Sequence, residues 1–258
     1  GRGATRAGAL LSLGLPGDED WDLGFLDGVE AACESYGLPL IGGDTIALPP
    51  DAPRVFGLTA IGRAGERVPL RNGGRAGDAL WLVGTLGDAG AGLAQLIDDP
   101  AATGPLVDTY RRPVPQLAAG QKLAPLANAM MDVSDGLLLD VSRLAQASKL
   151  SATIDLDALP LSTVFIAERG NSRQSRLFAA SAGDDYALLA ALPPEADPLR
   201  LSLPSRTTIV RIGTLVAGGP HLALVSNGSP VPLPERLGFE HLGFEHRSHS
   251  PSPMADRH

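Results

Sequence analysis

The stretch Asp132-Val133-Ser134-Asp135-Gly136-Leu137 places two carboxylates and a hydroxyl within four positions, directly before a helix that apolar spacing predicts over about 136–148. Acidic side chains at a tight turn suit a hard cation such as Mg²⁺, which prefers oxygen ligands and usually bridges them to a substrate phosphate. A helix N-terminus also favours phosphate through its free N–H groups. Ser134 or Asp135 alone would equally serve as a helix cap, but three such residues in four positions favour the functional interpretation.

Two further acidic segments are set among glycines, Gly42-Gly43-Asp44-Thr45 and Gly183-Asp184-Asp185-Tyr186. The first follows a predicted strand at 38–41, and the second precedes a predicted strand at 186–192. Each taken alone is also typical of a simple turn. Adjacent carboxylates repel, so we expect Asp184 and Asp185 to point in opposite directions, one to a site and one to a structural partner. The three segments together predict a phosphate-handling enzyme.

The glycine-rich stretch 71–78 has the composition of a turn and predicts a domain boundary. Before it, apolar spacing predicts an α/β unit with strands at 9–15, 38–41 and 55–61 and a helix at 21–36. After it, strands and helices alternate without strict βαβ repetition, which favours an α+β domain. The expected strands there are 79–83, 152–156, 186–192, 208–212 and 221–225, and the expected helices follow 84 and span 117–127 and 136–148. We therefore predict a partial N-terminal domain at 1–74, a C-terminal domain at 75–246 and a disordered tail at 247–258.

Composition excludes several classes of function. The chain of 258 residues has 29 acidic and 21 basic residues, a net charge of −8, which disfavours nucleic-acid binding through clustered basic side chains. No apolar run reaches the roughly 18 residues of a membrane span. The single cysteine, Cys33, cannot form an intrachain disulfide, which favours a cytoplasmic setting. The five histidines show no zinc-binding spacing, and neither a P-loop nor a Gly-x-Ser-x-Gly elbow is present.

An anionic substrate requires local positive charge or metal. Arg71, in the glycine-rich loop between the predicted domains, is the cation best placed to contact a phosphate. Arg111 and Arg112 are a second option. Each of these arginines alone is also typical of a solvated loop residue.

Taken in order, these segments resemble the thiamine-monophosphate kinase family over nearly the whole chain up to about Phe239. The resemblance rests on five elements, which are Arg6-Ala7-Gly8-Ala9-Leu10-Leu11-Ser12-Leu13-Gly14-Leu15-Pro16, Tyr36-Gly37 with Gly42-Gly43-Asp44-Thr45, Arg71 with Gly77-Asp78, Asp132-Val133-Ser134-Asp135-Gly136-Leu137, and Gly183-Asp184-Asp185-Tyr186. Each motif alone is weak, but the ordered set is specific. The resemblance implies an enzyme that phosphorylates thiamine monophosphate with ATP and Mg²⁺. It also implies a two-domain α+β architecture like that of aminoimidazole ribonucleotide synthetase, a homodimer formed through the sheet of the first domain, and an active site between the domains.

The same resemblance implies roles for individual residues. The implied Mg²⁺ ligands are Asp44, Asp132 and Asp135, the implied ATP contacts are Gly43, Asp44, Arg71 and Ser134, and the implied thiamine contacts are Asp184 and Phe239. Catalysis would consist of positioning and charge neutralisation, with no protein nucleophile.

The chain departs from the family pattern at three points. The family has Glu where this chain has Asp184, and Phe239 competes with Phe244 of the repeated Leu-Gly-Phe-Glu-His segment. The family also has a further N-terminal region with Mg²⁺-binding aspartates, and this chain begins after it. We therefore expect a fragment with an incomplete first domain and weak or no activity. Two alternatives stay open: another ATP-dependent synthetase of the superfamily, such as aminoimidazole ribonucleotide or selenophosphate synthetase, and a non-catalytic nucleotide-binding fragment.

Overall fold

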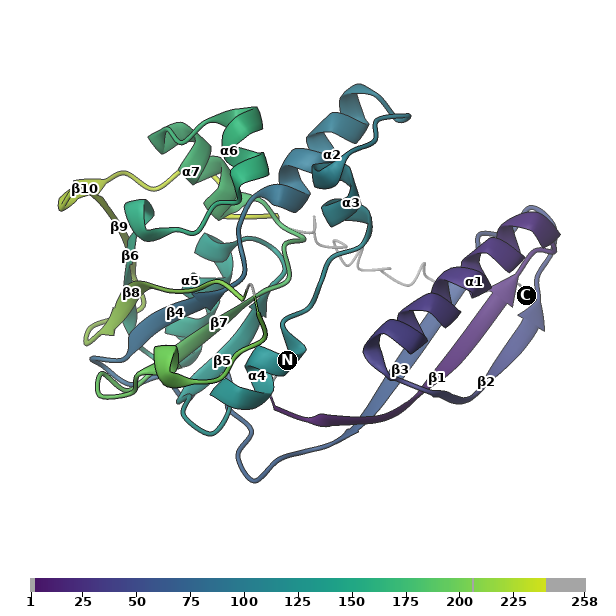
Figure 1. Ribbon diagram of the computed structural model, residues 1–258, viewed down its shortest axis with the longest axis horizontal. Coiled ribbons are helices and arrows are strands. Elements are labelled where there is room, and N and C mark those ends of the chain that lie inside the picture. Colours follow the sequence, from purple (N-terminus) through teal and green to yellow (C-terminus); the bar gives the residue numbers. More distant parts are fainter. Residues whose placement is uncertain (1–2, 206, 240–258) are drawn as a thin grey trace, which may run out of the picture.

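A computed structural model describes residues 3–205 and 207–239 of the chain. In the described part, a small unit with a three-stranded sheet stands beside a larger domain with a seven-stranded sheet (Figure 1). None of the described helices has both the length and the apolar character needed to cross a membrane. Phe244 and the predicted disordered tail at 247–258 lie outside the described residues.

The small unit consists of β1 (Thr5–Leu15), α1 (Glu19–Tyr36), β2 (Leu40–Ala47) and β3 (Val55–Arg63). The central strand β1 pairs in parallel with β2 and antiparallel with β3. Helix α1 begins at a side-chain cap, because the carboxylate of Asp18 accepts a hydrogen bond from the Trp21 N–H at 3.4 Å. It ends at Gly37, whose φ of 53° is left-handed.

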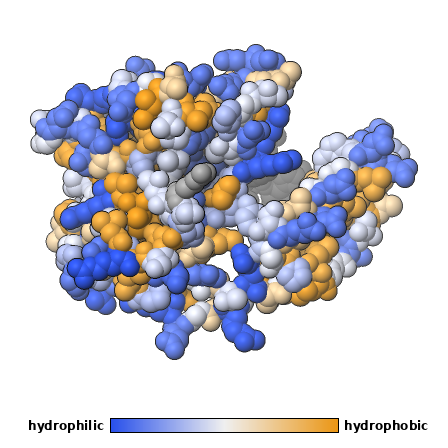
Figure 2. Space-filling model, in the orientation of Figure 1, coloured by the Kyte–Doolittle hydropathy of each residue, from blue (hydrophilic) through white to orange (hydrophobic). Residues whose placement is uncertain are grey.

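Among the residues that the structure describes, a helix covers only one face of the small sheet. Leu11 and Leu13 of β1 are buried under α1, and Phe56 of β3 stacks on Phe25 of the helix with ring centroids 4.4 Å apart. Because side chains alternate along a strand, Ser12 points to the opposite face, together with its β2 partner Asp44. Within the described residues no helix covers that face, and hydrophobic (orange) surface is visible on the small unit in Figure 2.

The large domain contains a seven-stranded sheet in which most neighbouring strands are antiparallel. Its sheet order is β10-β9-β6-β8-β4-β7-β5, with all pairs antiparallel except the parallel pair β6 and β9. The strands are β4 (Ala79–Val83), β5 (Ala129–Val133), β6 (Ser151–Asp155), β7 (Ala187–Leu192), β8 (Ile209–Val216), β9 (Leu222–Ser226) and β10 (Ser229–Val231). This mixed arrangement confirms the α+β class expected from the sequence.

Helices pack on both faces of this sheet, so every residue of β7 is buried. The helices are α2 (Asp88–Asp98), α3 (Pro105–Arg111), α4 (Leu117–Leu123), α5 (Leu137–Ala147), α6 (Thr163–Arg169) and α7 (Arg173–Ser181), with short 3₁₀ turns η1 (Leu156–Ala158) and η2 (Pro198–Arg200). Leu189 of β7 packs in the larger core with α5 and α7, whereas Leu188 packs in a second core with α4. The two cores are the two faces of one sheet.

Within the described part of the chain, side-chain hydrogen bonds join the small unit to the large domain. The hydroxyl of Tyr36 donates to the Pro113 carbonyl at 3.3 Å, and the side-chain amide of Gln121 donates to the Ala4 carbonyl at 3.1 Å. On the large domain, Gln121 belongs to α4 and Pro113 precedes this helix.

The sequence prediction was wrong in two respects. The strand expected at 38–41 runs from Leu40 to Ala47 as β2, so Gly42, Gly43 and Asp44 belong to a strand and not to a turn. The short elements α3, α6, α7 and β10 were not predicted, although Ser162 and Ser172 cap α6 and α7 through their hydroxyls.

Candidate functional site

The first acidic segment lies where β5 ends and α5 begins. Met131 and Val133 are buried in the larger core, so Asp132 between them points to the opposite face of the sheet, where it is exposed. Strand β5 is also an edge strand of the seven-stranded sheet. Asp132 is therefore accessible to a ligand, and Asp135 three residues later is partly buried.

The turn after β5 is held by a carboxylate from inside the helix. Asp140 is 1% exposed, and its Oδ2 accepts hydrogen bonds from the Ser134 N–H at 2.9 Å and the Asp135 N–H at 3.1 Å. Burial raises the pKa of Asp140, while these backbone bonds and Arg143 lower it. The alternative that Ser134 or Asp135 caps α5 is wrong, because the cap residue is Gly136 and no side chain caps the helix. Neither side chain is therefore used as a helix cap.

The segment from Gly183 to Tyr186 lies directly against this turn. The N–H of Asp184 donates to the Ser134 carbonyl at 2.8 Å. A Cβ on Gly183 would lie 2.8 Å from that same carbonyl oxygen, so only glycine allows the two backbones to approach so closely. Asp184 and Tyr186 both have left-handed backbones, with φ of 66° and 48°. Residues 132–136 and 183–186 are about 50 residues apart in sequence and lie side by side in the structure. We call these two segments together the acidic wall.

The pKa of Tyr186 is affected by the acidic side chains of both segments. Burial raises the pKa of its phenol, and the negative charges of Asp184, Asp132 and Asp135 raise it further. The Tyr186 phenol therefore lies within the electrostatic influence of three of the predicted site carboxylates.

Asp185 points away from this wall. Its carboxylate accepts hydrogen bonds from the Gly87 N–H at 2.7 Å and the Ala89 N–H at 3.2 Å, where α2 begins. Burial raises the pKa of Asp185 to about 7 against the effect of these two bonds, and the charges of Asp88 and Asp184 add to the rise. The expectation that one of the two adjacent aspartates has a structural partner is confirmed.

Phe239 lies beside the same turn. Its N–H donates to the Asp135 carbonyl at 2.8 Å, and its side chain is 60% exposed. A Cβ on the preceding Gly238 would lie 2.3 Å from the Asp135 carbonyl oxygen, so glycine allows this close approach. The structure therefore brings Phe239 next to Asp135. Its competitor Phe244 lies outside the described residues.

Gly43 and Asp44 lie in the small unit. A Cβ on Gly43 would lie 1.9 Å from the Leu11 carbonyl oxygen, so glycine at this position is required for β2 to pair with β1. Asp44 is exposed on the uncovered face of the small sheet, and its carboxylate accepts a hydrogen bond from the Thr45 N–H at 3.0 Å. Asp44 thus occupies a different sheet from Asp132 and Asp135.

Arg71 lies at the other end of the large sheet from the acidic wall. Strands β4 and β5 run in the same direction, because both pair antiparallel with β7. Arg71 precedes β4, whereas Asp132 is near the end of β5. The Arg71 carbonyl accepts a hydrogen bond from the Ser148 hydroxyl at 3.2 Å, just after the last turn of α5, a helix about 16 Å long. Within one chain, the structure does not bring Arg71 together with the acidic wall.

The donor chemistry of the wall fits Mg²⁺. Asp132, Asp135 and Asp184 offer carboxylate oxygens, which this hard cation prefers. Within residues 3–205 and 207–239 no group of three or more acidic, cysteine or histidine side chains is close enough to enclose a metal ion. Mg²⁺ usually binds one or two carboxylates together with substrate phosphates and water. One or two of these carboxylates are therefore a sufficient protein contribution.

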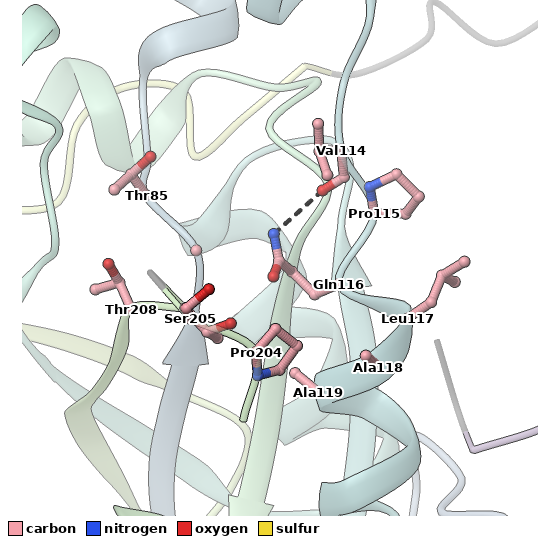
Figure 3. A pocket seen from close by; sticks show the side chains of 12 residues that line it. Thr85, Val114, Pro115, Gln116, Leu117, Ala118, Ala119, Pro204, Ser205 and Thr208 are labelled. Carbon is pink, nitrogen blue, oxygen red and sulfur yellow. Dashed lines mark hydrogen bonds between the residues drawn. The ribbon is translucent and has the colours of Figure 1, made fainter. Parts of the chain in front are cut away.

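A separate hollow of about 390 Å³ lies at the end of β4 (Figure 3). Thr85, Gln116 and Thr208 contribute polar side chains to it, and none of its described lining residues is charged. The Thr85 hydroxyl also donates to Asp88 at 2.8 Å. None of the predicted site residues lines this hollow, so the candidate site is the acidic wall.

Sequence comparison finds two family models in the chain. Residues 1–64 match the N-terminal domain of AIR synthase related proteins, and residues 75–224 match the C-terminal domain of the same proteins. Two curated relatives are both thiamine-monophosphate kinases. That of Escherichia coli K12 is 34% identical over 93% of this chain and 75% of its own length, and that of Caulobacter vibrioides is 33% identical over 93% of this chain and 70% of its own length.

Solved structures agree with this similarity. The structure of AaThiL complexed with AMPPCP and TMP is 30% identical, with a TM-score of 0.75 over 92% of this chain and 74% of that one. Thiamine-monophosphate kinase from Stenotrophomonas maltophilia K279a is 34% identical, with a TM-score of 0.73 over 89% of this chain and 74% of that one. The hydrogenase maturation protein HypE in complex with ATP has a TM-score of 0.71 at 19% identity, a likeness of fold alone.

Proposed function

This chain belongs to the thiamine-monophosphate kinase family of AIR synthase related proteins, and we propose from this premise that it transfers the γ-phosphoryl group of ATP to thiamine monophosphate. An AaThiL structure that contains AMPPCP and TMP supports both substrates, since it shares the fold of this chain at 30% identity. Thiamine diphosphate and ADP would be the products. A cytoplasmic location is part of the same proposal.

One observation carries the proposal for the site. The hydrogen bond from the Asp184 N–H to the Ser134 carbonyl joins the two acidic segments that the sequence singles out. Phosphoryl transfer needs little covalent help from a protein, so positioning and charge compensation are the main tasks of such a site. Carboxylates on one wall, beside an aromatic side chain, are suited to those tasks.

In the proposed arrangement, Asp132 and Asp135 hold Mg²⁺, which when bound offsets negative charge on the phosphates. Ser134 contacts ATP next to them. Asp184 contacts the thiamine group, and Phe239, whose side chain is exposed beside Asp135, stacks against it. An oxygen of the acceptor phosphate then attacks the γ-phosphorus in line, and the bond to the ADP oxygen breaks.

Three further residues complete the proposal. Asp44 is proposed as a Mg²⁺ ligand and ATP contact from the small unit, and Gly43 as an ATP contact beside it. Arg71 is proposed to contact ATP. Arg71 and Asp132 lie at opposite ends of the large sheet. Arg71 would therefore contact a part of ATP that is distant from the Mg²⁺ bound by Asp132, or it would contact ATP bound to a second copy of the chain.

A homodimer through the uncovered face of the small sheet is also part of the proposal. Apolar side chains on this sheet are strongly exposed, including Ile46 at 55% and Val55 at 60%. A sheet face with exposed apolar side chains and no covering helix is typical of an interaction surface. Pairing with a second copy would remove this surface from water.

The direct test is phosphoryl transfer from ATP to thiamine monophosphate with Mg²⁺, followed by chromatographic identification of the product. Thiamine diphosphate is the expected product, and Asp132→Asn should reduce its formation by at least about tenfold, because one charged oxygen ligand is lost. ATP turnover with no thiamine diphosphate would instead indicate another substrate within the superfamily. ATP binding without turnover would indicate a binding role.

A further inference from the structure

Helix α5 carries two charged residues, Asp140 and Arg143, that the proposed reaction leaves unassigned. They lie three positions apart and therefore on one face of the helix. Asp140 uses both carboxylate oxygens: Oδ2 accepts from the Ser134 and Asp135 N–H groups, and Oδ1 accepts from Arg143 at 3.1 Å. Since Asp140 is 1% exposed and fully bonded, it fixes the backbone of the turn at Ser134 and Asp135.

Arg143 extends this network to the side chain of Asp135. One nitrogen of its guanidinium group, Nη1, donates both to Asp140 Oδ1 and to Asp135 Oδ2. In the described part of the chain, Asp135 Oδ1 has no hydrogen-bond partner. Arg143 therefore holds one oxygen of Asp135 and leaves the other available to a cation.

We propose that Arg143, anchored by Asp140, is a positioning residue that orients the Asp135 carboxylate for binding a divalent cation. The inference rests on the proposed function, in which Asp135 is a metal ligand. Carboxylates that bind metals are typically held by hydrogen bonds from surrounding residues, and loss of such a partner weakens metal affinity roughly 10- to 100-fold. Asp140 fixes the main chain of the turn, and Arg143 fixes the rotamer of its ligand.

The test measures Mn²⁺ binding by electron paramagnetic resonance, in the absence of ATP and thiamine monophosphate. Arg143→Leu should weaken Mn²⁺ binding by roughly tenfold or more, and Arg143→Lys should restore part of the affinity, because lysine keeps a charged donor. Asp135→Asn provides the reference for loss of the ligand itself. Arg200→Leu is the matched control, since Arg200 also bonds an aspartate three positions away but its side chain is 86% exposed.

Far-UV circular dichroism and thermal melting would establish that each variant is folded. Arg143 is 38% exposed, and Arg143→Lys offers a second variant that keeps the charge should the leucine variant unfold. Unchanged or tighter Mn²⁺ binding in a folded Arg143→Leu variant would overturn the proposal, as tighter binding would show that Arg143 competes with the cation. Absence of Mn²⁺ binding in the parent chain, or no effect of Asp135→Asn, would overturn it too. Because no substrate is present, a failed kinase assay and a failed positioning role are distinguishable.

Discussion

Asp184 donates its backbone N–H to the carbonyl oxygen of Ser134 at 2.8 Å, although the two residues are 50 positions apart in the sequence. Ser134 follows the end of β5, and Asp184 precedes the start of the neighbouring strand β7. Strand β7 starts where β5 ends, because the two strands are antiparallel. The segment that leads into β7 therefore meets the turn that leaves β5. The geometry of the acidic wall depends on this meeting point.

Gly183→Ala should disrupt the acidic wall. The added Cβ would lie 2.8 Å from the Ser134 carbonyl oxygen, a contact that requires the backbone to shift. We expect a loss of stability of about 1–3 kcal/mol together with a lower kcat/KM for thiamine monophosphate. Kinetics and thermal melting would measure both effects. Gly219→Ala is the control, because no atom lies within 4 Å of the position that its Cβ would occupy. Equal behaviour of the two variants would contradict the close-packing argument.

Asp185 should make stability depend on pH. Its pKa is about 7 in the folded chain, above the 3.8 of an ordinary aspartate. Between these values the unfolded chain loses its proton while the folded chain keeps it, so stability falls as pH rises from about 4 to about 7 and is constant above that range. The slope within the window is at most about 1.4 kcal/mol per pH unit.

Asp185→Asn should remove this slope, because asparagine does not ionise. It should also lower stability at every pH, since only one oxygen remains for the N–H groups of Gly87 and Ala89. Denaturant unfolding of both chains at several pH values would measure the difference in the free energy of unfolding. A difference that stays constant between pH 4 and pH 8 would show that Asp185 does not titrate in this range.

Gly43→Ala tests whether glycine is needed in β2 for structure as well as for the proposed ATP contact. A Cβ there would lie 1.9 Å from the Leu11 carbonyl oxygen, so β2 would separate from β1. Hydrogen exchange should then increase in the small unit and stay unchanged in β4 and β7. Gly42→Ala is a close control, because its Cβ would meet only the end of the Leu10 side chain, at 3.3 Å. If Gly43→Ala lowered ATP affinity without faster exchange, the ATP contact would be its main role.

The sequence predicts those elements whose apolar pattern is continuous. The strand at Ala79–Val83 was predicted with its observed bounds, because all five of its residues are apolar, and four of them are buried in the structure. The segment at Gly42 to Asp44 was predicted as a turn, because glycine is typical of turns; here glycine instead allows two strands to approach. Local composition does not distinguish these two uses.

The candidate site was predicted only in part. Asp132, Asp135 and Asp184 were singled out by their glycine-rich surroundings, and in the structure their two segments are joined by the hydrogen bond from the Asp184 N–H to the Ser134 carbonyl. Asp140 and Arg143 were missed, since charged residues on a helix are typically solvated. One signal was present, because Asp140 interrupts the apolar face formed by Leu137, Val141 and Leu144. A charged residue within an apolar face must have a buried partner, and here that partner is the backbone of the turn.

Ile46→Lys should dissociate the proposed homodimer. Ile46 lies two residues after Asp44 on β2, so its side chain shares the uncovered face of the small sheet, where it is 55% exposed. A lysine in place of this apolar side chain would bring a charge into the proposed interface, which disfavours association. Sedimentation velocity should show a dimer for the parent chain and a monomer for the variant. Leu199→Lys is the control, because Leu199 is 64% exposed on the large domain and lies outside the proposed interface. A dimer that survives Ile46→Lys but not Leu199→Lys would move the interface to the large domain, and a monomeric parent chain would contradict the dimer itself.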